Sequence, residues 1–155
     1  MGCPTVGSPK TDRRSGPSRP FSRTSLRGLP GQGAGWFYNS TTVRQANAAA
    51  ANKIEVIVGV VEDAMHVVHG NEVYSSNGSN YGSIGIGVNV TNAFYAGTKR
   101  IVYFAGVEIG VSTVLDLMPS LGYSYYAAVE NSGAGTTTFY ANSGSSYLLG
   151  GIIRG

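Results

Sequence analysis

The sequence predicts an all-β protein, an antiparallel β-sandwich or jelly roll, that follows a disordered or extended N-terminal arm. Tyr, Thr, Val and Phe recur in short runs that Gly, Asn and Ser interrupt, which is typical of strands joined by tight turns. No long segment carries a helix signal. With 155 residues, of which 42% are hydrophobic, the chain is long enough for one core and too short for two ordinary domains.

The first region, residues 1–35, is the predicted arm. It contains five of the six prolines and is rich in Arg, Ser and Gly, so it cannot bury enough apolar surface to fold alone. Six basic residues and one acid give it a net charge of +5, and the rest of the chain is left with −2. Its candidate docking residues are Arg13, Arg14, Arg19, Arg23 and Arg27. We expect either a basic arm that docks on a partner, or an unstructured tail or upstream sequence that is not native to the domain.

The second region, residues 36–155, is the predicted β-sandwich domain. It opens on the aromatic run Trp36-Phe-Tyr38, and residues 53–61 alternate Ile54, Val56, Val58 and Val60 on one face. The opposite face of that strand is half apolar, so we expect it to be central or covered by a neighbouring chain. The full set of expected strands is 36–44, 53–61, 64–74, 82–90, 100–108, 111–117, 123–130, 136–141 and 147–153.

Two short segments differ from a plain alternating strand. Four consecutive alanines in residues 45–52 favour a helix, but the segment is too short to be helical unaided, and we expect a turn or one short helix between two strands. Glycines 85 and 87 share one face of the strand over 82–90, where a second backbone or a bulky aromatic side chain can approach closely.

The composition of the chain restricts the classes of protein to which it can belong. Only 12% of residues are charged, which suits adhesive or assembled proteins better than cytosolic enzymes. Beyond the arm the basic residues are scattered, which argues against a nucleic-acid groove. Cys3 is the single cysteine, so no internal disulfide can form. We find no secretory signal and no apolar run long enough for membrane insertion, and expect such a protein to reach the outside of a cell by lysis or as part of a particle.

The candidate chemical sites are weak, and we expect no enzymatic activity and no cofactor. Glu62, Asp63, His66 and His69 have metal-ligand residue types, but on a strand the two histidines point to opposite faces, so we expect no metal site. A glycosidase pair drawn from Glu108, Asp116 and Glu130 would require two of these carboxylates to meet in space. No nucleophile elbow is present.

The aromatic residues near the C-terminus carry the best argument for binding. Tyrosine combines a flat apolar ring with a hydroxyl group, which suits sugar rings and protein interfaces alike, although such residues also pack in cores and between subunits. Alternation places Tyr123 and Tyr125 on one face and Tyr126 on the other. The residues proposed for a binding or interface surface are Tyr123, Tyr125, Tyr126, Tyr140 and Tyr147.

The order of several motifs resembles virion structural proteins of tailed bacteriophages, of the tail-fibre, head-fibre or decoration type. The motifs are Trp36-Phe-Tyr38, Arg44-Gln-Ala-Asn47, Ser83-Ile-Gly-Ile-Gly-Val-Asn89, Gly122-Tyr-Ser-Tyr-Tyr with Glu130, and Gly135-Thr-Thr-Thr-Phe-Tyr140. The resemblance covers residues 36–155 and implies a β-rich, non-enzymatic homotrimer that is attached to the particle at one end and exposes the other to the host surface. It would give residues 1–35 the place of an attachment segment, although their composition differs from that of a trimeric stalk.

We therefore expect a virion component that contacts itself, other virion proteins and, on the host, a cell-surface glycan. The alternatives are a free carbohydrate-binding or adhesin module, which would be monomeric, and then a small glycan hydrolase.

Overall fold

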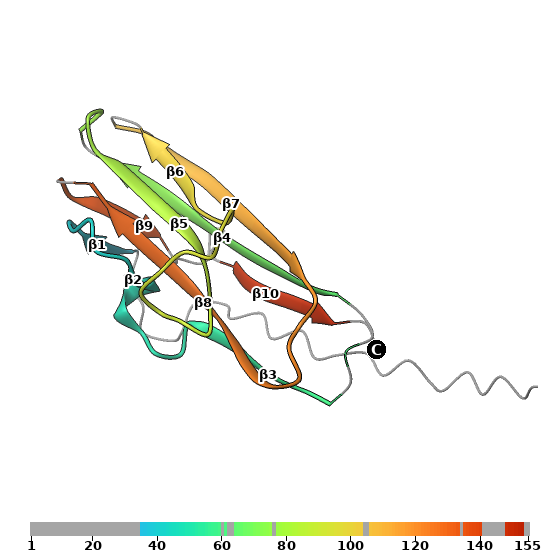
Figure 1. The fold of residues 1–155 in the computed structure, drawn as a ribbon. Helices are drawn as coiled ribbons and strands as arrows, with labels where there is room; N and C mark the ends of the chain where they lie inside the picture. The colour runs from blue at the N-terminus through green and yellow to red at the C-terminus, as the bar shows by residue number, and fades with distance from the viewer. Residues whose placement is uncertain are drawn as a thin grey trace, which may run out of the picture.

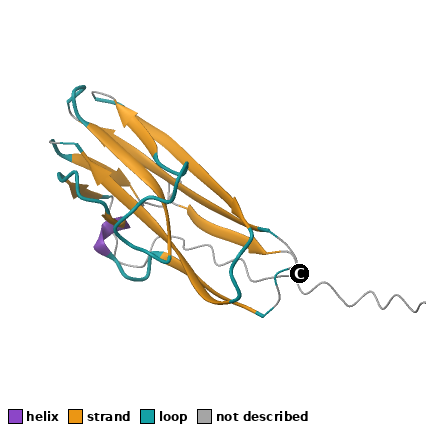
Figure 2. Ribbon diagram, viewed as in Figure 1, coloured by secondary structure: helices purple, strands orange, loops and turns teal. Residues whose placement is uncertain are grey.

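Two facing β-sheets make up the protein (Figures 1 and 2), described by a computed structural model over residues 35–59, 61, 64–75, 77–103, 106–133, 135–140 and 148–153. The strands in these residues are β1 (Trp36–Tyr38), β2 (Arg44–Gln45), β3 (Lys53–Val58), β4 (Met65–Ser75), β5 (Tyr81–Val88), β6 (Arg100–Tyr103), β7 (Glu108–Leu117), β8 (Gly122–Ser132), β9 (Thr137–Tyr140) and β10 (Leu148–Ile153). A short 3-10 helix, η1 (Ala46–Ala48), links β2 to β3.

Each sheet is built around one long central strand. In sheet A, β4 pairs with β7 along one edge and with β10 and then β9 along the other, and β1 pairs with β9. In sheet B, β8 pairs with β5 along one edge and with β3 and then β2 along the other, and β6 pairs with β5. All these pairings are antiparallel, and in each sheet two short strands share one position.

The path of the chain between the sheets defines a jelly roll. Strand β1 lies in sheet A, β2 and β3 in sheet B, β4 in A, β5 and β6 in B, β7 in A, β8 in B, and β9 and β10 in A. This alternation, with β8 and β9 returning beside the first strands, is the double Greek key. The predicted all-β sandwich or jelly roll is confirmed.

The core lies between the sheets and follows from alternation along the strands. Strand β4 contributes Met65, Val67 and Val73 from sheet A, while β5 contributes Ile84 and Ile86 from sheet B. The indole of Trp36 stacks on Phe139 with ring centroids 6.0 Å apart, so the aromatic run at residue 36 closes one end of this core.

One of the predicted strands is wrong, and for a second the structure excludes one of two expected positions. The strand expected over 36–44 is two strands in different sheets, because the chain turns at Ser40, whose hydroxyl accepts a hydrogen bond from the Thr42 amide at 3.1 Å. Of the two positions expected for β3, central or covered by a neighbouring chain, the structure excludes the first, because β3 occupies an outer position of sheet B with its outward Ile57 77% exposed. The short helix expected within 45–52 is confirmed as η1.

The two glycines of β5 make room for the segment that follows the strand. A Cβ atom at Gly85 would lie 2.3 Å from the Phe94 ring, and one at Gly87 would lie 2.4 Å from the Val90 carbonyl oxygen. The chain after β5 therefore folds back against the outer face of sheet B, and the close approach predicted at these glycines is confirmed.

The replacement Gly87→Ala is expected to lower the free energy of unfolding by about 1–3 kcal/mol, because the added methyl group meets backbone atoms that cannot rotate away. Urea denaturation of both proteins measures the effect. Gly110→Ala is the matched control, since a Cβ atom there meets no heavy atom within 4 Å. Equal unfolding midpoints for the two variants would show that the space above Gly87 is not needed.

Candidate functional site

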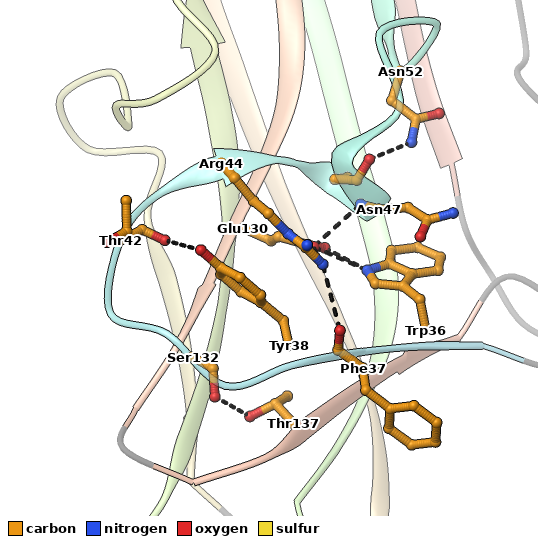
Figure 3. Close-up of polar contacts among 11 residues, drawn as sticks. Trp36, Phe37, Tyr38, Thr42, Arg44, Asn47, Asn52, Glu130, Ser132 and Thr137 are labelled. Carbon is orange, nitrogen blue, oxygen red and sulfur yellow. Dashed lines mark hydrogen bonds and ion pairs between the residues drawn. The ribbon is translucent and has the colours of Figure 1, made fainter.

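A buried carboxylate, Glu130, joins the two sheets near the end of β8 (Figure 3). Its side chain is fully buried and lies between the layers, where it accepts hydrogen bonds from the Trp36 indole Nε1 at 2.8 and 3.0 Å. Arg44 donates from Nε at 2.9 Å and forms an ion pair through Nη2 at 2.8 Å. The backbone N–H of Asn47 donates at 3.1 Å. One carboxylate therefore holds β1, β2 and η1 against β8.

The partners of Glu130 are themselves held in place. The Arg44 guanidinium lies 3.7 Å from the centre of the Tyr38 ring, a cation–π contact, and its Nη2 also donates to the Phe37 carbonyl at 3.5 Å. Asn47 has a left-handed backbone (φ 54°), a conformation that asparagine tolerates better than most residues. The turn thus brings its amide to the carboxylate.

The electrostatics of Glu130 follow from its burial. Burial raises the pKa of this carboxyl to about 7, while the charge of Arg44 and the hydrogen bonds from Trp36, Arg44 and Asn47 oppose the rise. The four hydrogen-bonding groups named above are all donors, which is the arrangement that suits an ionised carboxylate. The cluster therefore acts to hold β1, β2 and η1 against β8.

Sequence reasoning identified the members of this cluster only as separate motifs. Trp36, Tyr38, Arg44, Asn47 and Glu130 all belong to the motifs quoted above, yet they span 94 residues from Trp36 to Glu130. The sequence does indicate the direction of the Glu130 side chain. Glu130 lies two and four residues after Ala128 and Tyr126 on β8, so its side chain points to the same inward face as theirs. The partners of an inward acid could not be read from the sequence.

The predicted tyrosine surface is divided between different parts of the fold. Tyr123 is 56% exposed and Tyr125 is half-buried, both on the outer face of sheet B, as alternation predicted. Tyr126 is only 1% exposed and lies in the core, so its assignment to a binding surface is wrong. Tyr140 is half-buried on β9 in the other sheet. Tyr147 and the arginines of the arm lie outside the described residues.

Tyr123 and Tyr125 form a platform together with Glu55 and Lys53 on the neighbouring strand β3. The two rings are tilted by 44°, with centroids 6.3 Å apart. Glu55 lies opposite Tyr125 in the strand pairing, accepts a hydrogen bond from the Tyr123 hydroxyl and forms an ion pair with Lys53 at 2.7 Å. The Lys53 Nζ lies 5.4 Å from the centre of the Tyr125 ring. We call these four residues the tyrosine platform.

The outer face of sheet A carries an apolar patch. Val68 on β4 pairs with Val114 on β7 and with Gly150 on β10, while Leu148 and Ile152 lie two residues to either side of Gly150. Val114, Leu148 and Ile152 are 43%, 40% and 41% exposed. We call Val68, Val114, Leu148 and Ile152 the apolar patch. Large side chains exposed together in this way are typical of surfaces that meet another protein.

The two histidines of β4 point to opposite faces, as predicted. His66 lies on the outer face, with Nδ1 2.6 Å from Asp116, and His69 lies in the core, with Nδ1 2.8 Å from the Gly85 carbonyl oxygen. Glu62 and Asp63 lie outside the described residues. In the part of the chain that the structure describes, no group of three His, Cys, Asp or Glu side chains could hold a metal ion.

The carboxylates considered for hydrolysis do not meet as a pair. Glu108 and Asp116 lie at opposite ends of β7, eight residues or about 26 Å apart, and Glu130 is enclosed by its donors. A retaining or inverting glycosidase needs its carboxylates within about 10 Å.

Comparisons of the chain with protein-family models, curated proteins and solved structures gave no match. Among the described residues, no helix has the length and hydropathy to cross a membrane.

Proposed function

We propose that the chain is a non-enzymatic structural component of a bacteriophage particle, a fibre or decoration protein that assembles as a homotrimer and presents a surface for host attachment. The apolar patch of sheet A is the observation that carries this proposal. A face with three large side chains about 40% exposed gains free energy when a second copy covers it.

The placement of the other two clusters supports attachment at one end and recognition at the other. Glu130 holds β1, the strand that continues from residues 1–35, while Tyr123 lies seven residues earlier on β8. That separation is about 23 Å along the strand. The end at which the arm joins the domain would face the other virion proteins, and the tyrosine platform would face outward.

The chemistry of the arm suits its proposed role. Its net charge of +5 against −2 on the rest of the chain would favour an acidic surface of another virion protein, or of a neighbouring subunit. Strong salt dependence of that attachment would follow, because exposed charges are screened at high ionic strength.

The replacement Val114→Asp is expected to convert a trimer into a monomer, because each interface would have to bury an unpaired carboxylate. Size-exclusion chromatography with light scattering measures the mass of the full chain and of the variant. Val107→Asp is the matched control: the side chain is 55% exposed but lies between β6 and β7, away from the patch, and we expect that variant to remain trimeric.

A monomeric parent protein would contradict the proposed assembly and favour the free carbohydrate-binding module. A trimer that survives Val114→Asp would place the interface on another face.

A further inference from the structure

We propose that the tyrosine platform is a binding site for a neutral hexopyranose residue of a glycan. The inference deepens the host-attachment role proposed above by naming a site and a class of ligand. It involves sheet B alone, so it can be tested separately from assembly through sheet A.

The rings provide the apolar part of the site. Tyr123 is 56% exposed, and the tilted Tyr125 ring beside it gives two adjoining aromatic surfaces on one face of β8. A hexopyranose with equatorial hydroxyl groups has a flat face of C–H bonds, which fits against an exposed aromatic ring. The exposed Ile57, opposite Tyr123 in the strand pairing, extends this apolar surface.

The polar groups provide donors and acceptors at the rim of the rings. Lys53 and Tyr123 both donate to Oε1 of Glu55, and among the described residues no hydrogen bond to Oε2 is present. Hydrogen bonds from Lys53 and Tyr123 hold the pKa of Glu55 below its usual value, so the carboxylate stays an acceptor near neutral pH. Its second oxygen can accept from a sugar hydroxyl, and Lys53 can donate to a neighbouring one.

The charges favour a neutral ligand. Lys53 and Glu55 are paired at 2.7 Å, so the platform presents no net charge. A charged sugar would be attracted by one of these two groups and repelled by the other, so it would gain no net Coulomb attraction from the pair. A neutral sugar uses both groups without breaking their ion pair.

The site is also positioned by rigid elements. The four residues of the platform come from paired strands, and Asn89 fixes the edge of β8 by two hydrogen bonds, donating from its N–H to the Tyr125 carbonyl and accepting from the Tyr125 N–H, each at 2.8 Å. Preorganisation of this kind reduces the entropy lost on binding.

Saturation-transfer difference NMR tests the proposal, with the full chain and three probes: the neutral β-1,4-linked hexasaccharides of glucose, mannose and galactose. We expect at least one to bind with a dissociation constant in the millimolar range or below. Tyr123→Ala should weaken that binding by about tenfold or more. Tyr103→Ala is the matched control, because Tyr103 is equally exposed, 56%, on β6 of the same sheet and should not affect binding.

Three outcomes would overturn the proposal: binding of none of the hexasaccharides, an equal loss in Tyr103→Ala, or a change of oligomeric mass in Tyr123→Ala, which would make the platform an interface between copies. The Val114→Asp variant separates the two proposals. Sugar binding by that variant as a monomer would support both proposals, whereas a trimeric parent protein that binds no sugar would leave assembly standing and reject the site.

Discussion

Replacement of Glu130 by alanine is expected to lower the free energy of unfolding by about 3 kcal/mol when measured below its pKa of about 7. The change removes the single acceptor shared by Trp36, Arg44 and the Asn47 amide, and it leaves a cavity between the sheets. Urea denaturation followed by tryptophan fluorescence measures the effect directly, because Trp36 is the single tryptophan of the chain and donates to this carboxylate.

Glu55→Ala is the matched control for this loss. Glu55 is also an ion-paired glutamate of sheet B, but its side chain is 51% exposed, so water replaces its partners and we expect the unfolding midpoint to be unchanged. If Glu130→Ala unfolded at the same urea concentration as the parent protein, the proposed role of Glu130 in holding β1 and η1 would be wrong.

The free energy of unfolding is expected to depend on pH in opposite directions in two variants, Glu130→Gln and His69→Asn. Burial raises the pKa of Glu130 from 4.5 to about 7, so the folded state binds this proton more tightly than the unfolded state. Its contribution to stability is present below pH 4.5 and is lost as pH rises through 7. Burial lowers the pKa of His69 from 6.5 to about 4, so its contribution is present above pH 6.5 and is lost as pH falls through 4.

These two contributions oppose each other between pH 4.5 and 6.5, each with a slope of up to about 1.4 kcal/mol per pH unit. We therefore expect the parent protein to show a nearly flat profile in this window. Stability should rise with pH in Glu130→Gln, which keeps only the histidine. It should fall with pH in His69→Asn, whose side-chain amide can still donate to the Gly85 carbonyl.

Urea midpoints collected across this window measure both slopes. Parallel profiles for the parent protein and both variants would mean that neither group changes its proton affinity on folding.

The strands and the inward residues could be predicted from the sequence, because both depend on local alternation. In β3, Ile54 and Val56 are buried, and Glu55 and Ile57 are exposed. In β8, Tyr123 and Tyr126 lie on opposite faces of the sheet, as alternation predicts. The same rule does not say what lies above a face. Alternation alone therefore leaves Tyr126 among the candidates for a binding surface, although the opposite sheet covers it.

The sequence by itself determined the class of fold, the position of nearly every strand and the tight packing at Gly85 and Gly87, since each follows from residues close together in the chain. Only the tertiary structure decided which distant residues meet. Trp36, Arg44 and Glu130 form one cluster because strands from both sheets enclose it, and Tyr123 meets Glu55 because β3 pairs with β8 in one register. Strand pairing and sheet packing are non-local, and alternation within a strand carries no information about its partner.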